Sequence, residues 1–274
     1  MTEALKFEGR CAIVTGAGHG IGRALAEALA ARGAKVVVAD VHAERAAKVA
    51  ARVGGLSVVC DVGDPDSVNS LVRAATLAFG PVEVLCSNAG VGDLGPDLAS
   101  SVDQVRRIVD INLLAHVWAA QAVLPGMLER GRGALVQTIS SAALITGPSG
   151  MGYTLTKHGA LGFAEWVVLN YAHRGIRVTC LCPNAVNTAM LGRNEDDEAA
   201  GHHSRDPELS AQLGEIIEPE VCATAALAAL DEGKFLALPH PRVGDSFLRK
   251  ATDYDEWLGR TASRIRRMRG ESTT

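Results

Sequence analysis

The chain of 274 residues carries 27 Lys and Arg against 31 Asp and Glu, which gives a formal net charge of -4. Its 47% hydrophobic and 21% charged residues are ordinary for a folded globular protein and exclude a disordered, collagen-like or coiled-coil chain. Because the net charge is not positive, nucleic acid is not expected as a partner. Length and composition together favour a single domain over residues 1–274.

Short apolar runs alternate with longer helical patterns along most of the chain. The apolar runs consist almost entirely of Val, Ile, Leu and Cys, as expected for parallel strands that helices cover on both faces. We predict strands at 11–15, 35–39, 56–60, 82–86, 134–139, 177–181 and 234–238, and helices at 21–32, 43–53, 65–79, 102–128, 153–173 and 219–230. This order predicts a doubly wound, Rossmann-type α/β fold with a mostly parallel seven-stranded sheet and helices on both faces.

The sequence gives no sign of a membrane or secreted protein. No apolar run reaches the roughly 18 residues that span a bilayer, and the N-terminal segment lacks a basic region followed by an apolar stretch of secretory length. We therefore expect a cytoplasmic protein without a membrane partner. Most of the six cysteines fall inside the apolar runs, so we expect buried free thiols.

Residues 193–207 are too polar to belong to the core. We interpret the surrounding segment, about 188–217, as a lid over the substrate that becomes ordered when ligand binds. Within it, Glu198, His202 and His203 could suggest a metal site, but zinc needs more ligands at strand or helix spacing. A solvated loop is the favoured interpretation, and no metal is predicted.

Five arginines occur between residues 260 and 269 without an acidic residue among them. Trp257, Thr261, Ile265 and Met268 fall at helical spacing and form a less polar stripe beside these arginines. We predict an amphipathic helix over about 253–269. It is expected to pack on its own domain or on a neighbouring subunit, in preference to nucleic acid or a membrane.

A glycine-rich turn, Thr15-Gly16-Ala17-Gly18-His19-Gly20-Ile21-Gly22, follows the first predicted strand directly. Such a turn lets backbone amides approach a pyrophosphate at the positive end of a helix dipole, so a dinucleotide is implied. The common G-x-G-x-x-G fingerprint is not met, because Ile21 stands at its third glycine; the pattern present is T-G-x-x-x-G-I-G. The alternative of a tight turn without a ligand is the less favoured one.

Asp40 ends the second predicted strand, close to the spacing at which an acidic residue reaches the adenosine ribose of a dinucleotide. A carboxylate there would repel a 2′-phosphate by about 1 to 4 kcal/mol. NAD is therefore favoured over NADP as the cofactor. The alternative is that Asp40 only caps the following helix.

Tyr153 and Lys157 are four residues apart and share one face of a predicted helix. A fixed ammonium favours the phenolate and would lower the tyrosine pKa from about 10 toward neutrality, and an oxidised nicotinamide ring would act in the same direction. The pair could then serve as a general acid and base. By itself, this spacing is often no more than an exposed helical contact.

Further motifs accompany this pair in a fixed order along the chain. With the glycine turn, Asn88-Ala89-Gly90, Asn112, Ser140 and Tyr153-x-x-x-Lys157, the sequence resembles the classical short-chain dehydrogenase/reductases from about residue 10 to 239. The resemblance implies that Tyr153 is the general acid and base and that Lys157 lowers its pKa and binds the nicotinamide ribose. It implies that Ser140 polarises the substrate oxygen, that Asn112 anchors a proton-relaying water, and that the protein is a homo-oligomer, a dimer or a tetramer.

The choice between Ser140 and Ser141 is open in the sequence. Counting thirteen residues back from Tyr153, or seven on from Gly133, gives Ser140, which we favour. In many relatives the second serine of an Ile-Ser-Ser run is the catalytic one, so Ser141 is the alternative.

The resemblance also implies a set of cofactor contacts. Asp61 and Val62 resemble the pair that holds adenine, and the segment after the sixth strand resembles the one that holds the nicotinamide carboxamide. Two residues depart from the family pattern, Asn184 where glycine is usual and Ser87 where asparagine is usual; asparagine tolerates positive φ, so the turn at Asn184 is expected to persist. The predicted cofactor residues are Gly16, His19, Gly20, Ile21, Gly22, Asp40, Val41, Asp61, Val62, Asn88, Ala89, Gly90, Tyr153, Lys157, Pro183, Val186 and Thr188.

We therefore expect an NAD-dependent oxidoreductase that transfers a hydride between the nicotinamide and a secondary alcohol or ketone. The substrate is expected to be hydrophobic, because segments 91–98, 142–151 and 190–213 supply apolar and small pocket residues. One alternative is an NADPH-dependent oxoacyl or carbonyl reductase, which Asp40 disfavours. The other is a dinucleotide-binding sensor or scaffold without turnover, which the intact Asn, Ser, Tyr and Lys set disfavours.

Overall fold

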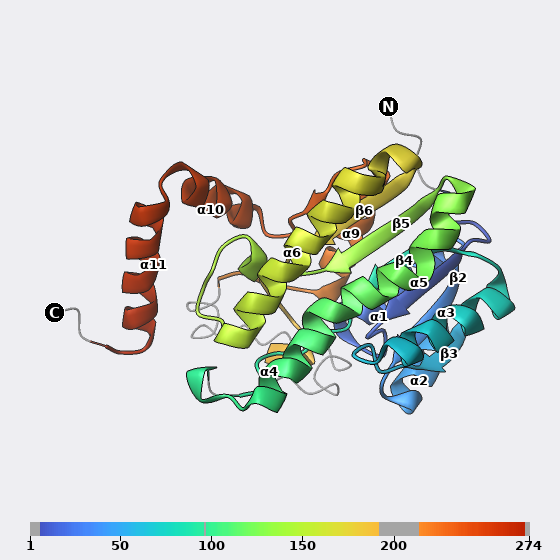
Figure 1. Ribbon diagram of the computed structural model, residues 1–274, viewed down its shortest axis with the longest axis horizontal. Coiled ribbons are helices and arrows are strands. Elements are labelled where there is room, and N and C mark those ends of the chain that lie inside the picture. The colour runs from blue at the N-terminus through green and yellow to red at the C-terminus, as the bar shows by residue number, and fades with distance from the viewer. Residues whose placement is uncertain (1–5, 96, 192–213, 272–274) are drawn as a thin grey trace.

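A computed structural model describes residues 6–95, 97–191 and 214–271 (Figure 1). Among these residues, seven parallel strands form one sheet in the order β3-β2-β1-β4-β5-β6-β9. The strands are β1 Cys11–Thr15, β2 Lys35–Asp40, β3 Leu56–Val59, β4 Val82–Ser87, β5 Gly133–Thr138, β6 Ile176–Leu181 and β9 Leu236–Ala237. The predicted doubly wound fold is confirmed, and the one-domain organisation over residues 1–274 stays a prediction.

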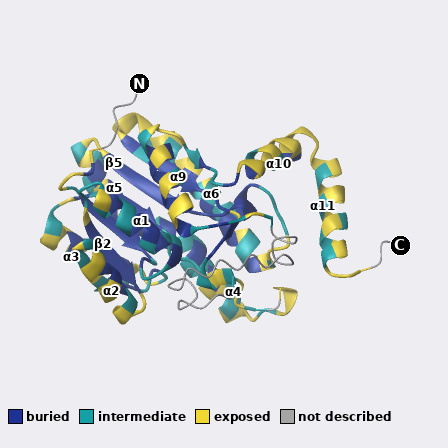
Figure 2. Ribbon diagram, turned by 180° about the vertical axis from the view of Figure 1, so that it is seen from behind, coloured by how far each residue is buried: buried dark blue, intermediate teal, exposed yellow. Residues whose placement is uncertain are grey.

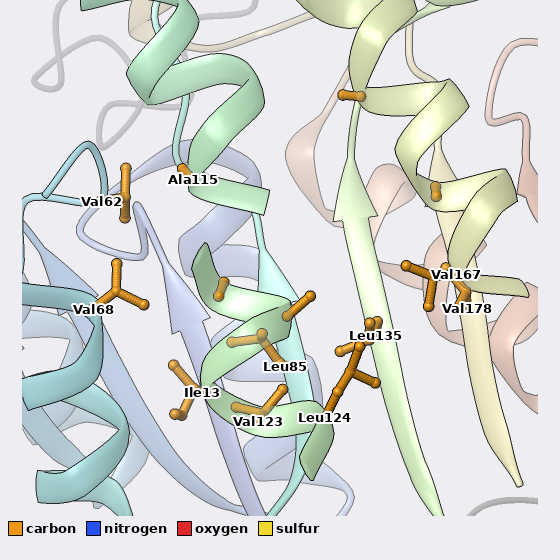
Figure 3. Close-up of a cluster of buried hydrophobic side chains, with 14 of the residues drawn as sticks. Ile13, Val62, Val68, Leu85, Ala115, Val123, Leu124, Leu135, Val167 and Val178 are labelled. Atoms are coloured by element: carbon orange, nitrogen blue, oxygen red, sulfur yellow. The ribbon is translucent and has the colours of Figure 1, made fainter. Parts of the chain in front are cut away.

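Helices cover both faces of the sheet because successive strand residues point to opposite sides. On one face, α3 (Pro65–Phe79), α5 (Ala115–Arg130) and α6 (Met151–Tyr171) pack on strand residues such as Ile13 and Leu135. Figure 3 shows part of this core, with strand residues near Val123 and Leu124 of α5. On the other face, α1 (Gly20–Ala31), α2 (Ala43–Val53) and α9 (Pro219–Asp231) pack on residues such as Val14 and Val136.

The strand order reverses direction between β1 and β4. The chain passes from β1 to β2 and β3 on one side, and then returns to β4, β5 and β6 on the other side. In open parallel sheets, ligands bind in the crevice that this reversal leaves at the carboxyl ends of the strands. The segments that follow β1 and β4 carry the glycine-rich turn and Asn88-Ala89-Gly90. The fold therefore brings both motifs to the same edge.

The helix predicted over 102–128 is interrupted. It consists of α4 (Val102–Val109), a π-helical turn at Asp110–Leu114 and α5. A π-helical turn shifts the register of the following side chains and frequently occurs at functional sites. Asn112 lies in this turn and is fully buried.

The stretch Val102–Arg130 also has the length and apolar composition of a membrane span, with a hydropathy of 1.3 over its most apolar window. Half of that window is buried inside the protein. Its residues Ala119, Val123 and Met127 belong to the core against the sheet. This is the arrangement of a core helix.

The C-terminal part contains one predicted and one unpredicted helix. The amphipathic helix expected over about 253–269 is α11 (Tyr254–Met268), and α10 (Pro241–Thr252) precedes it. Pro241 at the first position of α10 suits a helix start, and the segment that follows is amphipathic at helical spacing, so both signals of this helix are present in the sequence. Figures 1 and 2 show α11 standing apart from the sheet, and none of its residues is buried.

Short elements complete the described chain. All six cysteines are buried and free, as predicted. Most of the predicted lid, with Glu198, His202 and His203, lies outside the described residues; the pairing of Ala185–Val186 with Ile216–Ile217 brings its two ends together. The remaining elements are β7 (Ala185–Val186), β8 (Ile216–Ile217) and 3-10 turns at Asp97–Ala99, Ser141–Ala143, Ala172–Arg174 and Ala189–Leu191.

Candidate active site

The glycine positions of the glycine-rich turn leave no room for a side chain. A Cβ on Gly22 would lie 2.1 Å from the carbonyl oxygen of Gly16, and a Cβ on Gly16 would lie 2.8 Å from Cα of Ala89. Helix α1 begins at Gly20, and its N-cap residue His19 makes no side-chain capping bond. An anion-binding helix terminus requires backbone amides that no side chain caps. The amides in the first turn of α1 meet this requirement with respect to His19.

Asp40 is buried, 5% exposed, and its carboxylate holds the glycine-rich turn. It accepts hydrogen bonds from the amide of Gly18 at 2.9 Å and from the amide of His42 at 3.0 Å. Helix α2 begins at Ala43 with His42 as its N-cap, so Asp40 binds the amide of the cap residue and not an amide within the helix. The sequence alternative, in which Asp40 only caps this helix, is less well supported by this geometry.

A cavity of about 290 Å³ lies beside Asp40. It brings together eight of the predicted cofactor residues from the ends of β1, β2, β3 and β4: Gly16, His19, Asp40, Val41, Asp61, Val62, Ala89 and Gly90. Two arginines near it were not predicted. Arg107 lines the cavity and pairs with Asp61 at 2.8 Å, and Arg45 lies beside Gly18. Arg107 is 46 residues from Asp61, and Arg45 is 27 residues from Gly18, so no local sequence pattern links either arginine to the residue it lies beside.

The segment after β4 is tied to the end of β1. The hydroxyl of Thr15 accepts from the amides of Asn88 at 3.0 Å and Ala89 at 3.1 Å, and Nδ2 of Asn88 donates to the Thr15 carbonyl at 3.0 Å. Asn112 does not line the described cavities; its Oδ1 accepts from the amide of Val91 and its Nδ2 donates to the Val91 carbonyl, both at 2.8 Å. Asn112 therefore fixes the loop that leaves β4.

A second cavity, of about 120 Å³, contains three of the four predicted catalytic side chains. Ser140, Tyr153 and Lys157 line it together with these predicted cofactor residues: His19, Gly20, Ile21, Asn88, Gly90, Pro183, Val186 and Thr188. His19 and Gly90 line both cavities, so the two spaces adjoin along the carboxyl edge of the sheet. Two adjoining compartments with a glycine-rich turn between them fit a dinucleotide.

Lys157 is 3% exposed, and its Nζ lies 5.3 Å from the centroid of the Tyr153 ring. Nζ also donates to the carbonyl of Thr138 at 3.4 Å. Burial lowers the pKa of Lys157 to about 8. The ammonium is therefore held where the phenol can respond to its charge.

The predicted lowering of the Tyr153 pKa is not found in the chain alone. Burial raises the pKa of Tyr153 above its ordinary value of 10.0, a hydrogen bond with Ser140 opposes that rise, and the charge of Asp93 adds to it. Desolvation of the phenolate outweighs the favourable contacts, because the ring is enclosed by the pocket. This effect depends on enclosure, which the Tyr-x-x-x-Lys spacing does not specify.

His116, which belongs to none of the sequence motifs, is buried close to this site. It is 1% exposed, and neither ring nitrogen has a hydrogen-bond partner among the described residues. Burial, and secondarily the charge of Lys157, lowers the pKa of His116 to about 3. It is therefore a neutral imidazole at physiological pH.

Ser140 and Ser141 face different surroundings. Ser140 lines the catalytic cavity, and its Oγ accepts from the amide of Ala142 at 3.1 Å. The hydroxyl of Ser141 donates to Oδ1 of Asn184 at 3.2 Å. Asn184 itself does not adopt positive φ, and its amide donates to Nδ1 of His240 at 3.1 Å. The hydrogen bond to His240 therefore stabilises the turn after β6. The expectation of a positive φ at Asn184 is wrong.

A family model described as short chain dehydrogenase matches residues 10–199. The chain belongs to the short-chain dehydrogenase family. This membership agrees with the fold and with the order of the motifs at the sheet edge. The protein is accordingly an oxidoreductase of a family that acts on alcohols and ketones.

Several known proteins resemble this short-chain dehydrogenase over most of its length. Cyclohexanol dehydrogenase of Acinetobacter sp. is 32% identical over 238 residues, which cover 84% of this chain and 92% of that protein. The 2,5-dichloro-2,5-cyclohexadiene-1,4-diol dehydrogenase of Sphingobium indicum is 35% identical over 232 residues, covering 82% and 91%. The crystal structure of a short chain dehydrogenase/reductase from Burkholderia phymatum in complex with NAD has a TM-score of 0.80 at 28% identity, covering 92% and 96%.

Proposed function

We propose that this protein is an NAD-dependent dehydrogenase that interconverts a hydrophobic secondary alcohol and its ketone. The observation that carries the proposal is the crevice in which Ser140, Tyr153 and Lys157 adjoin the glycine-rich turn. The names of the alcohol dehydrogenases that resemble the chain support the substrate class. A cytoplasmic location and a homo-oligomeric state, a dimer or a tetramer, stay predictions.

Two side chains would act on the substrate oxygen. During oxidation, the Tyr153 phenolate takes the hydroxyl proton of the alcohol, and the Ser140 hydroxyl holds the same oxygen while its charge changes. Lys157 supplies positive charge beside the phenol, which favours the phenolate. The nicotinamide, when bound, would supply the hydride chemistry.

The predicted preference for NAD rests on Asp40. Its buried carboxylate lines the compartment that would hold the adenosine, where a 2′-phosphate would meet a like charge. The structural relative in complex with NAD is consistent with this choice. Asp61, in the same compartment, forms an ion pair with Arg107 at 2.8 Å, which compensates part of its charge.

A coupled assay tests the proposal. The full chain is incubated with cyclohexanol and other secondary alcohols in the presence of NAD or NADP, and the reduced cofactor is followed by absorbance. The proposal predicts turnover with NAD on at least one alcohol. Binding of NAD without turnover on any alcohol or ketone would instead favour a dinucleotide-binding sensor.

Replacement of Ser140 with Ala is expected to lower kcat by about 10²-fold, because the hydroxyl that holds the substrate oxygen is lost. Replacement of Ser141 with Ala is expected to leave kcat within about threefold of the wild type, because its hydroxyl is bound to Asn184. Steady-state kinetics of the two variants measured side by side test the assignment. Near-normal turnover of Ser140→Ala would transfer the role to Ser141.

Asp93 is expected to contribute to the pH dependence of alcohol oxidation, in addition to the larger effect of burial on Tyr153. Its Oδ1 accepts from the amide of Tyr153 at 2.9 Å, and its charge raises the pKa of that tyrosine. Asp93→Asn keeps an oxygen acceptor but removes the charge, so the pKa of Tyr153 falls and the acid limb of kcat against pH moves to lower pH. Oxidation requires the phenolate, which fixes the direction of this shift.

Asp97→Asn is the matched control for Asp93→Asn. Oδ1 of Asp97 accepts from the amide of Met151 at 2.9 Å in the same helical turn, but Asp97 does not contribute to the pKa of Tyr153. Its pH profile is expected to match the wild type. An acid limb that does not move in Asp93→Asn would contradict the electrostatic role of Asp93.

A further inference from the structure

A buried lysine attaches the C-terminal helices to the loop that follows β5. Lys250, on α10, is 8% exposed and donates from Nζ to the carbonyl of Leu144 at 2.9 Å. The same Nζ lies 5.5 Å from the centroid of the Tyr254 ring and 5.1 Å from that of Trp257, within range of a cation–π attraction. The start of α11 is therefore tied to the loop that carries Ser140, although α11 stands apart from the sheet (Figure 1).

Between this loop and the two helices lies a groove, which we call the arm groove. It consists of two cavities of about 460 and 180 Å³ that share four lining residues: Ile145, Asn184, Ser246 and Arg264. Asn184 also lines the catalytic cavity. The arm groove therefore shares a wall residue with the space that contains Ser140 and Tyr153, so a substrate that occupies both spaces must extend past Asn184.

The arm groove carries a concentration of positive charge. Arg242 and Arg249 of α10 and Arg264 of α11 line it, against a single described carboxylate, that of Glu215. Arg249 donates to Oγ of Ser246 at 3.0 Å, and among the described residues no carboxylate forms an ion pair with Arg242 or Arg249. Guanidinium groups in this setting suit a planar or tetrahedral oxyanion.

Apolar side chains also line the arm groove, among polar ones. Ile145, Val243, Trp257 and Ile265 line it together with the arginines. Trp257 and Ile265 belong to the less polar stripe of α11, which was expected to pack on the domain or on a neighbouring subunit. Part of this stripe therefore faces the arm groove. A ligand with an apolar body and an anionic end would match both kinds of wall.

We infer that the arm groove binds a carboxylate or phosphate at the far end of an apolar substrate whose hydroxyl or keto carbon lies beside Tyr153. This inference rests on the proposed dehydrogenase function and narrows its substrate class. It assigns to Arg242 and Arg249 a role in substrate selection that leaves the chemistry at Tyr153 unchanged. It also explains why the C-terminal helices are tied to the Ser140 loop by a buried lysine.

The test uses secondary alcohols with and without a terminal charge. The full chain is assayed with NAD on a series of (ω-1)-hydroxyalkanoates of increasing length, their methyl esters, and cyclohexanol. For the best length, the acid is expected to have a KM about tenfold to hundredfold below that of its ester. Inhibition by the alkanoate and by the alkyl phosphate of the same length, both without a hydroxyl, decides between carboxylate and phosphate.

Variants assign the effect to the arm groove. Arg242→Gln with Arg249→Gln is expected to raise the KM of the acid to that of the ester and to leave the ester unchanged, which also shows that the variant is folded. Arg266→Gln with Arg267→Gln is the matched control, since these exposed arginines of α11 do not line the groove. The control is expected to keep the preference for the acid.

The possible failures are distinguishable. Equal KM values for acid and ester in the wild type, or an equal change for both in the double variant, would overturn the inference while the dehydrogenase function stands. If none of these alcohols is oxidised but the sensor test shows NAD binding, the proposed function fails. In that case, direct binding of the alkyl anions still tests the arm groove: weaker binding to the double variant than to the control supports it, and equal binding contradicts it.

Discussion

Tyr153→Phe is expected to reduce kcat for alcohol oxidation by about 10²-fold to 10⁴-fold, because the group that moves the hydroxyl proton is lost. The substitution keeps the ring that lies 5.3 Å from Nζ of Lys157, so the pocket is expected to keep its shape. Affinity for NADH, measured by fluorescence titration, is therefore expected to stay close to that of the wild type. A large loss of kcat at unchanged affinity separates proton transfer from cofactor binding.

Tyr171→Phe provides the matched control for this experiment. Tyr171 ends the same helix, α6, and packs edge-on against Trp166 at a centroid distance of 5.6 Å, outside the lining of the catalytic cavity. The same removal of a phenolic oxygen is expected to leave kcat unchanged there. If Tyr153→Phe kept more than about a tenth of the wild-type kcat, the assignment of Tyr153 as general acid and base would be wrong.

Asp40→Ala is expected to remove most of the preference for NAD over NADP. The ratio of kcat/KM for the two cofactors should fall by about tenfold or more, since the like-charge repulsion of a 2′-phosphate is lost. The affinity for NAD should also decrease, because Asp40 holds the amides of Gly18 and His42. The ratio is therefore the decisive measurement, and the absolute KM for NAD is not.

Asp61→Asn tests whether any carboxylate in the adenosine compartment would have the same effect. Asp61 lines the same cavity but pairs with Arg107 at 2.8 Å. Its replacement is expected to change the affinity for NAD and NADP by similar factors, so the ratio stays near that of the wild type. An unchanged ratio in Asp40→Ala would mean that Asp40 only shapes the glycine-rich turn.

Much of the site could be located from the sequence because each motif ends a recognisable strand. The carboxyl ends of parallel strands lie at one edge of the sheet. The strand pattern therefore predicts that Asp40, Asn88 and Ser140 lie near the glycine-rich turn that follows β1. The Tyr153 and Lys157 pair follows from helical periodicity alone. These inferences need only local spacing and the rule that the strands run parallel.

Other features depend on residues that are far apart in the chain. The bond from Asp93 to the first turn of α6, the pair of Asp61 with Arg107, and the attachment of Lys250 to Leu144 each join segments with no shared sequence pattern. The raised pKa of Tyr153 has the same origin, because the cost of desolvation is set by everything that encloses the ring. These contacts and this pKa shift can be predicted only when the packing of side chains that are distant in sequence is known.

The amino-acid sequence by itself determined the doubly wound sheet, the dinucleotide turn and the identity of the residues at the strand ends, since periodicity and backbone conformation are local properties. Only the tertiary structure decided that Ser140 faces the catalytic cavity while Ser141 faces Asn184, and that α10 and α11 border a groove that shares Asn184 with this cavity. Exposure, charge environment and cavity shape are sums over neighbours in space, and the order of residues along the chain does not fix those neighbours.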